Sequence, residues 1–195
     1  MDETAPEPSA GDLPAAGRAE FKARVRIRTA VVSDAATILT LIRELAEYEQ
    51  LTHEVVVTED LLQATMFGPQ SATSALLAET DDGETVGTAI YFRTYSTFLG
   101  REGIYLEDLF VRPEYRGRGA GSQLLAAVAA EAAQLGGRLE WAVLDWNQSA
   151  IDVYESLGAV RHSEWLRYRL VGDPLAALAK RAEAVAPSEP GQSLG

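Results

Sequence analysis

The chain has 195 residues, 47% hydrophobic and 24% charged, which is ordinary for one globular domain with a sizeable core. It contains no cysteine, which excludes disulfides, thiolate zinc sites and a cysteine nucleophile. The only histidines, His53 and His162, lack the spacing of a metal-ligand pair, so we expect no metal. The formal charge of -12 disfavours nucleic acid and attracts cations such as protonated amines, although it also fits a surface that serves solubility alone.

The ends of the chain differ in composition from its centre. Residues 1–22 are acidic and rich in Pro and Ala, and we expect them to be a disordered tail. Residues 23–175 are expected to form the domain, and residues 176–195 to hold the end of a C-terminal helix and a second disordered tail. The first residues lack the basic start and apolar stretch of a secretory signal, and no apolar run approaches the length of a membrane span. We therefore expect a cytoplasmic protein with no membrane partner.

Strand and helix patterns alternate through the first half of the chain. Ser33 or Asp34 is expected to cap a helix with one apolar face, and the acids after Thr58 predict a second helix. The Asp-Gly pair within residues 81–84 is typical of a tight hairpin turn. The strands expected in this half cover residues 25–29, 75–80, 85–93 and 104–111.

The second half continues the alternation. An Ala-rich amphipathic helix is expected to stop at Gly136, and Asn147 is a suitable N-cap for a helix over residues 149–157 that ends before Gly158. The strands expected here cover residues 139–144 and 161–171. The whole pattern predicts a mixed sheet covered by helices.

A Gly- and Arg-rich turn joins the strand ending at Val111 to the Ala-rich helix. Its glycines allow a ligand to approach the backbone, the first amides of the helix attract an anion, and Arg116 and Arg118 add charged donors. The turn lacks the Gly-Lys-Ser/Thr of a Walker A loop and the GxGxxG spacing of a dinucleotide fold. By itself it fits either an anion site or a plain connector.

The turn resembles the acetyl-CoA loop of GNAT superfamily N-acetyltransferases, Arg/Gln-x-x-Gly-x-Gly/Ala, with a second similar region from Asn147 through Tyr154 to Ala159. Further segments are similar to the spermidine/spermine (diamine) acetyltransferase-like branch, at residues 41–49, 105–111 and 145–147. The resemblance covers about residues 24 to 172. It implies a single α/β (mixed α+β) domain, with a central mixed, mostly antiparallel twisted sheet flanked by helices, and acetyl-CoA as cosubstrate.

The resemblance also implies site residues. Tyr154 would be the general acid toward the CoA thiolate, and Glu107 the general base, through water, or the anchor of a cationic amine. The residues expected to bind acetyl-CoA are Leu109, Phe110, Val111, Arg116, Gly117, Arg118, Gly119, Ala120, Gly121, Ser122, Asn147, Gln148, Ser149 and Ala150. Those expected to bind the amine are Tyr48, Glu49, Glu107, Asp108, Glu140, Trp141 and Ala142.

Ordinary structural roles remain open for several of these residues. Tyr154 and Trp141 could be core aromatics, Asn147 only a helix cap, and Glu49 part of a solvated helix face. Strand alternation places Asp108 on the opposite face from Glu107.

The function that the resemblance implies is acetyl transfer from acetyl-CoA to a small cationic amine, by direct attack in a ternary complex. Alternatives are a protein or peptide amine acetyltransferase and a non-catalytic acyl-CoA-binding sensor. Residues 98–103 depart from the animal polyamine enzymes by a lengthened loop, with Phe98 in place of a tryptophan wall. The amine therefore stays open between spermidine, a short diamine and a thialysine-like compound. The resemblance further implies a homodimer.

Overall fold

The computed structural model describes residues 25–183 of the chain. The tail predicted at residues 1–22 lies outside the described residues, and so do residues 184–195 of the C-terminal segment predicted at residues 176–195. The chain divides into two compact units between Ala142 and Val143, and each unit is described by itself. In the described part, no helix is long and apolar enough to cross a membrane.

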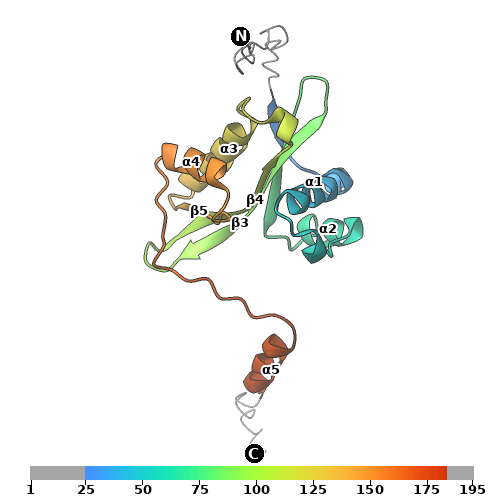
Figure 1. The fold of residues 1–195 in the computed structure, drawn as a ribbon. Helices are drawn as coiled ribbons and strands as arrows, with labels where there is room; N and C mark the ends of the chain where they lie inside the picture. Colours follow the sequence, from blue (N-terminus) through green and yellow to red (C-terminus); the bar gives the residue numbers. More distant parts are fainter. Residues whose placement is uncertain (1–24, 184–195) are drawn as a thin grey trace, which may run out of the picture. The chain divides into compact units, whose positions relative to one another are not determined.

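The first unit is built on one sheet with the strand order β1-β2-β3-β4-β5 (Figure 1). Strands β1 to β4 pair antiparallel with their neighbours, and β5 pairs parallel with β4. The mixed, mostly antiparallel sheet expected from the sequence is thus confirmed. The strands are β1 (Arg26–Thr29), β2 (Thr73–Glu79), β3 (Thr85–Ser96), β4 (Arg101–Val111) and β5 (Leu139–Trp141).

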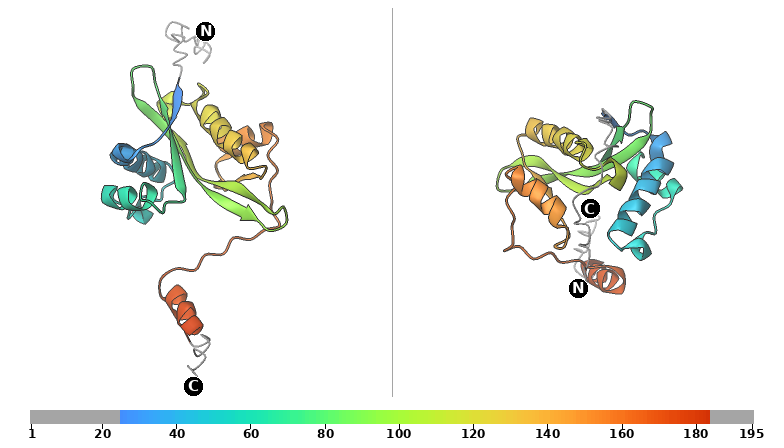
Figure 2. Two further views of the ribbon diagram at one scale, coloured as in Figure 1. Left: turned by 180° about the vertical axis from the view of Figure 1, so that it is seen from behind. Right: turned by 45° about the horizontal axis from the view of Figure 1, so that its top comes forward.

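Helices cover both faces of this sheet. Helices α1 (Ala35–Tyr48) and α2 (Glu59–Met66) lie on one face, and α3 (Ala120–Gln134) lies on the other (Figures 1 and 2). The core between α1, α2 and the sheet includes Ile38, Leu41, Leu62, Leu77, Ile90 and Phe110. Short 3-10 turns lie at η1 (Val32–Asp34), η2 (Thr52–Glu54) and η3 (Pro113–Tyr115).

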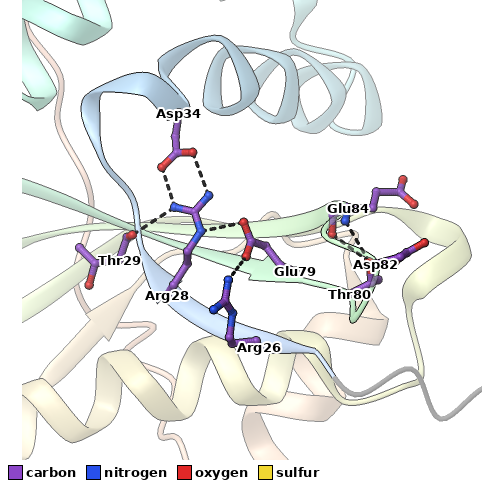
Figure 3. A network of polar contacts seen from close by, with 8 residues as sticks. All are labelled: Arg26, Arg28, Thr29, Asp34, Glu79, Thr80, Asp82 and Glu84. Atoms are coloured by element: carbon purple, nitrogen blue, oxygen red, sulfur yellow. Dashed lines mark hydrogen bonds and ion pairs between the residues drawn. The ribbon is translucent and has the colours of Figure 1, made fainter.

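The predicted helix starts are present, with one difference in how they are made. Thr58 caps α2 by accepting a hydrogen bond from the Leu61 amide. Asp34 occupies the N-cap of α1 but makes no side-chain cap bond. Its carboxylate instead accepts hydrogen bonds of 2.6 and 2.8 Å from Arg28, which also donates to Glu79 at 2.7 Å (Figure 3). This network fastens the short edge strand β1 to β2 and to the start of α1.

The second unit contains α4 (Gln148–Ser156) and α5 (Gly172–Glu183). The side chain of Asn147 accepts a hydrogen bond of 3.3 Å from the Ala150 amide, so the predicted cap is confirmed. The strand predicted over residues 161–171 is wrong, because that segment belongs to no ladder in the described chain. A strand needs a partner, and the described part of this unit offers only helices.

Candidate active site

A β-bulge in β4 lies at the residue predicted to be the general base. Ile90 of β3 lies opposite Asp108 and Tyr91 lies opposite Leu106, so Glu107 is the extra residue in β4. After the bulge, Phe110 joins the core that α1 and α2 cover, and Asp108 lies two residues before it. We expected Asp108 and Glu107 on opposite faces of the sheet because side chains alternate along an unbroken strand. The bulge at Glu107 interrupts that alternation.

Beyond Leu106, one edge of β4 is not covered by a strand of the first unit. Strand β5 pairs only with residues 104–106, whereas β3 follows β4 as far as Val111. Within residues 25–142, the backbone groups of residues 107–111 that point away from β3 therefore have no ladder partner. Leu109, Phe110 and Val111, expected to contact the donor, lie on this stretch. An uncovered strand edge can supply backbone amides to a polarised carbonyl oxygen.

The Gly-rich turn has the backbone geometry expected of an anion site. Gly117 has φ 71° and Gly119 has φ 89°, values that a residue with a Cβ adopts only with strain. Gly119 is the N-cap of α3, which has no side-chain cap hydrogen bond. The first amides of α3, at Ala120, Gly121 and Ser122, thus lie at an uncapped positive helix end.

The two arginines of this turn point to different partners. The Arg116 Nε donates a hydrogen bond of 2.8 Å to the Val111 carbonyl, and its guanidinium carbon lies 4.3 Å from the centre of the Tyr48 ring. The Arg118 guanidinium lies 5.7 Å from the Tyr115 ring. The sequence predicted both arginines as phosphate donors and gave no sign of the contact between Arg116 and Tyr48.

A cavity of about 260 Å³ lies between the end of α1, the segment that follows it and β4. Three of its lining residues are acids, Glu49, Glu54 and Asp108. The other lining residues are apolar: Ile42, Leu45, Ala46, Leu51, Val55, Val56 and Val57. Glu54 and the three valines were not singled out from the sequence. The sequence does contain one sign of this cavity. Three consecutive valines lie in the connection between two helices, where polar residues are expected.

Two acids of this cavity, Asp108 and Glu49, hold a proton more tightly than carboxyl groups do in water. Burial first, and then the negative charges of Glu107 and Glu49, raise the pKa of Asp108 to about 6. Burial also raises the pKa of Glu49. An ammonium group in the cavity would relieve this repulsion, so the arrangement favours a cation. Among residues 25–183, no group of three or more His, Cys, Asp or Glu side chains is arranged to hold a metal.

Three further residues predicted to bind the amine lie at the end of β5. The Glu140 carboxylate accepts a hydrogen bond of 2.7 Å from Arg138, and Trp141 and Ala142 follow it. Phe98, expected as an aromatic wall, lies in the turn between β3 and β4 with 97% of its surface exposed. The amine contacts of Glu140, Trp141 and Ala142 stay predictions.

The predicted site residues of the second unit lie on α4. Asn147 caps the helix, the Ser149 hydroxyl lies 3.2 Å from the Asn147 side-chain oxygen, and Gln148 donates to Asp152 at 2.6 Å. Burial raises the pKa of Tyr154 above its ordinary value, which keeps its phenol protonated at neutral pH. The contacts of Asn147, Gln148, Ser149 and Ala150 with acetyl-CoA, and the proton transfer from Tyr154, stay predictions.

Comparison with known proteins decides the family. The acetyltransferase (GNAT) family matches residues 38–159, more than half of the chain. The chain belongs to this family. A thialysine N-epsilon-acetyltransferase from Bos taurus is 44% identical over 166 residues, which are 80% of this chain and 97% of that protein. A human spermidine/spermine N(1)-acetyltransferase-like protein is 34% identical over 142 residues, 69% of this chain and 20% of that protein.

A solved structure shares the fold of the chain. An integron cassette protein from the mobile metagenome of Vibrio cholerae has a TM-score of 0.67 at 27% identity, over 80% of this chain and 98% of that one. The predicted family, the predicted fold and the prediction of an acetyl-CoA-dependent N-acetyltransferase are thus confirmed. Acetyl-CoA is the cosubstrate that this family uses.

Proposed function

We propose that this GNAT enzyme transfers the acetyl group of acetyl-CoA to a primary amine of a small cationic acceptor, a diamine, polyamine or thialysine-like compound. The observation that carries the proposal is the acidic cavity of Glu49, Glu54 and Asp108. Asp108 belongs both to this cavity and to the uncovered stretch of β4, so the acceptor would lie next to the donor. The names of the related enzymes support the same class of acceptor.

The chemistry follows from the charge of the acceptor. A primary ammonium must lose a proton before its nitrogen can attack the thioester carbonyl. Asp108, with its pKa of about 6, is ionised at neutral pH and can accept that proton, directly or through water. Glu107, at the bulge, is the second candidate base, and Glu49 and Glu54 would hold a further cationic group of the acceptor. As the nitrogen–carbon bond forms and the carbon–sulfur bond breaks, the nitrogen releases its second proton to water and the departing thiolate takes a proton, which we assign to Tyr154.

We assign the donor to the uncovered edge of β4 and the Gly-rich turn. Backbone groups of residues 109–111 would meet the pantetheine arm and the acetyl oxygen, and the amides of residues 117–122 would meet the pyrophosphate. When bound, acetyl-CoA supplies the activated acyl group. In this proposal the protein's part is to hold the carbonyl, bind the cation and move two protons. In this proposal the nucleophile is the amine itself, which agrees with a chain that has no cysteine to form an acyl-cysteine intermediate.

We further infer that two copies of the chain pair through residues 160–171. The segment carries the large side chains of Trp165, Leu166 and Tyr168 and has the alternation of a strand, but it pairs with no strand within the described residues of its own unit. A ladder with a second copy would bury them. Light scattering on Trp165→Asp should then give a smaller mass than the unchanged protein. A monomeric mass for the unchanged protein would contradict this inference.

Thiol release with a panel of acceptors tests the proposed function. The panel contains putrescine, spermidine, thialysine and a short peptide with a free amino terminus. We expect turnover with one or more of the small cationic amines and an acetylated amine as the product by mass spectrometry. Turnover with the peptide alone would move the function to protein acetylation. Binding of CoA without turnover on any amine would indicate a sensor.

A further inference from the structure

We propose that the side chain of Arg116 is a positioning group that acts through Tyr48, connecting the donor turn to the acceptor cavity. Its role would thus differ from that of Arg118, whose contact stays within the turn and η3. The inference rests on the proposed function, because it assigns the donor to the turn and the acceptor to the cavity.

The contacts of Arg116 give the reason. Its guanidinium carbon lies 4.3 Å from the centre of the Tyr48 ring and 5.7 Å from that of Phe110, while its Nε holds the Val111 carbonyl at 2.8 Å. Stacking of a guanidinium on an aromatic face is attractive and fixes the plane of both groups. Arg116 therefore connects the last residue of α1, the end of β4 and the turn.

A second arginine supports the same connection. Arg112, just before η3, donates two hydrogen bonds of 2.9 Å to the carboxylate of Glu44 on α1. Arg112 lies just before η3 and Arg116 just after it, and both contact residues in the last turns of α1. A paired, bidentate contact of this kind restrains orientation as well as distance.

Tyr48 carries the connection to the acceptor side. Glu49 follows Tyr48 directly as the C-cap of α1, lines the acidic cavity and raises the pKa of Asp108 by its charge. We infer that a restraint on the Tyr48 side chain also restrains the end of α1, from which Glu49 extends. Arg116 reaches the acceptor through this helix end and makes no contact with the reacting atoms in the proposed arrangement.

Side-chain packing does not restrain the backbone of the turn at Gly117. Gly117 and Gly119 both have positive φ, and a Cβ at Gly117 would meet no atom within 4 Å. We infer that stacking of Arg116 on Tyr48 selects the conformation that presents the turn's amides to the pyrophosphate and Glu49 to the acceptor. Because coupling between two binding sites is reciprocal, acetyl-CoA should then strengthen amine binding, and the amine should strengthen acetyl-CoA binding.

The test compares two donors, acetyl-CoA and S-acetylpantetheine, which lacks the pyrophosphate. Arg116→Gln and Tyr48→Leu remove the stack from opposite sides. Arg118→Gln is the matched control, because it removes the same charge from the same turn without touching α1. Tyr48→Phe keeps the aromatic face and should weaken CoA binding less than Tyr48→Leu does. Thermal unfolding of each variant checks that it is folded.

We expect Arg116→Gln and Tyr48→Leu each to lower kcat/KM for the amine about three- to tenfold with either donor. The double variant should be no worse than the more affected single one. Arg118→Gln should affect only the reaction with acetyl-CoA. The proposal would be overturned by a loss in Arg116→Gln that disappears with S-acetylpantetheine, or by additive losses in the double variant.

A binding measurement separates failure of this inference from failure of the proposed function. Calorimetry with CoA requires no turnover, and Tyr48→Leu should weaken CoA binding about threefold although residue 48 is outside the turn. Unchanged CoA affinity in Tyr48→Leu would contradict the connection. If the unchanged protein acetylates no amine but Tyr48→Leu binds CoA more weakly, the proposed function fails and the connection stands.

Discussion

Asp108 on β4 and Glu49 at the end of α1 line the same cavity, and the charge of Glu49 contributes to the raised pKa of Asp108. The relationship depends on the bulge at Glu107, after which the alternate residues Asp108 and Phe110 belong to the side of the sheet that α1 covers. A carboxyl group with a pKa of about 6 in an acidic cavity has two measurable consequences, one for stability and one for catalysis.

Asp108→Asn should stabilise the fold at neutral pH. The folded-state pKa of Asp108, about 6, exceeds the ordinary value, so the folded protein binds this proton more tightly than the unfolded chain. The stabilising effect of this proton is complete below about pH 4 and lost as the pH rises through about 6. At about pH 7.5, Asp108→Asn should therefore raise the free energy of unfolding by up to about 3 kcal/mol, and at about pH 4 by almost nothing.

Urea titrations at the two pH values measure this difference. Asp81→Asn, in the exposed turn between β2 and β3, is the control and should change the free energy of unfolding little at either pH. An equal gain for Asp108→Asn at both pH values would show that the gain does not come from the charge.

The acidic limb of the pH profile should identify the base. If Asp108 accepts the proton, kcat/KM rises with pH through about 6, and Asp108→Asn removes that limb. Glu107→Gln removes a negative charge that raises the pKa of Asp108, so the limb should remain and move to lower pH. Steady-state kinetics across the pH range measure both. Loss of the limb in Glu107→Gln alone would assign the base to Glu107.

Tyr154→Phe should lower kcat about 100-fold, because the departing thiolate loses its proton donor. Affinity for CoA should stay nearly unchanged, since the ring is kept. Tyr95→Phe is the control, on a tyrosine of β3 that is 64% exposed. Single-turnover kinetics and calorimetry give the two quantities separately. A parallel loss of turnover and CoA affinity would mark Tyr154 as a packing residue.

Gly119→Ala should weaken CoA binding about tenfold through the backbone of the turn. Gly119 has φ 89°, and an alanine there costs about 1 to 2 kcal/mol or shifts the amides that begin α3. Gly100→Ala is a matched control, because Gly100 has φ 64° in the turn between β3 and β4, at the opposite end of β4 from the Gly-rich turn. Both variants should lose similar stability, and only Gly119→Ala should bind CoA more weakly. Equal CoA affinities would remove the turn from the site.

Local signals in the sequence were sufficient for much of the fold. The cap at Asn147, the start of α2 after Thr58 and the hairpin at Gly83 each depend on side chains within a few residues, and all three are present. The family motif likewise predicted the turn at Arg116 to Gly121. The backbone of this turn needs glycines at positions with positive φ, and the motif gives their spacing.

Features that depend on partners distant in the chain could not be predicted. The bulge at Glu107 is set by the register between β3 and β4. The alternation of side chains along β4 alone therefore could not show which face of the sheet Asp108 occupies. The contact of Arg116 with Tyr48 joins residues from different elements. Residues 161–171 have a strand's alternation, but a ladder needs a second strand, and the described chain supplies none there.

The proposed function requires that the cavity of Glu49 and Asp108 receives the cationic acceptor. The most direct test is the ratio of kcat/KM for cadaverine to that for pentylamine, which differ by one amino group. If Glu49 binds the second ammonium group, Glu49→Gln lowers this ratio about tenfold, whereas Glu59→Gln at the exposed start of α2 leaves it unchanged. A ratio that is the same in Glu49→Gln as in the unchanged protein would contradict the account.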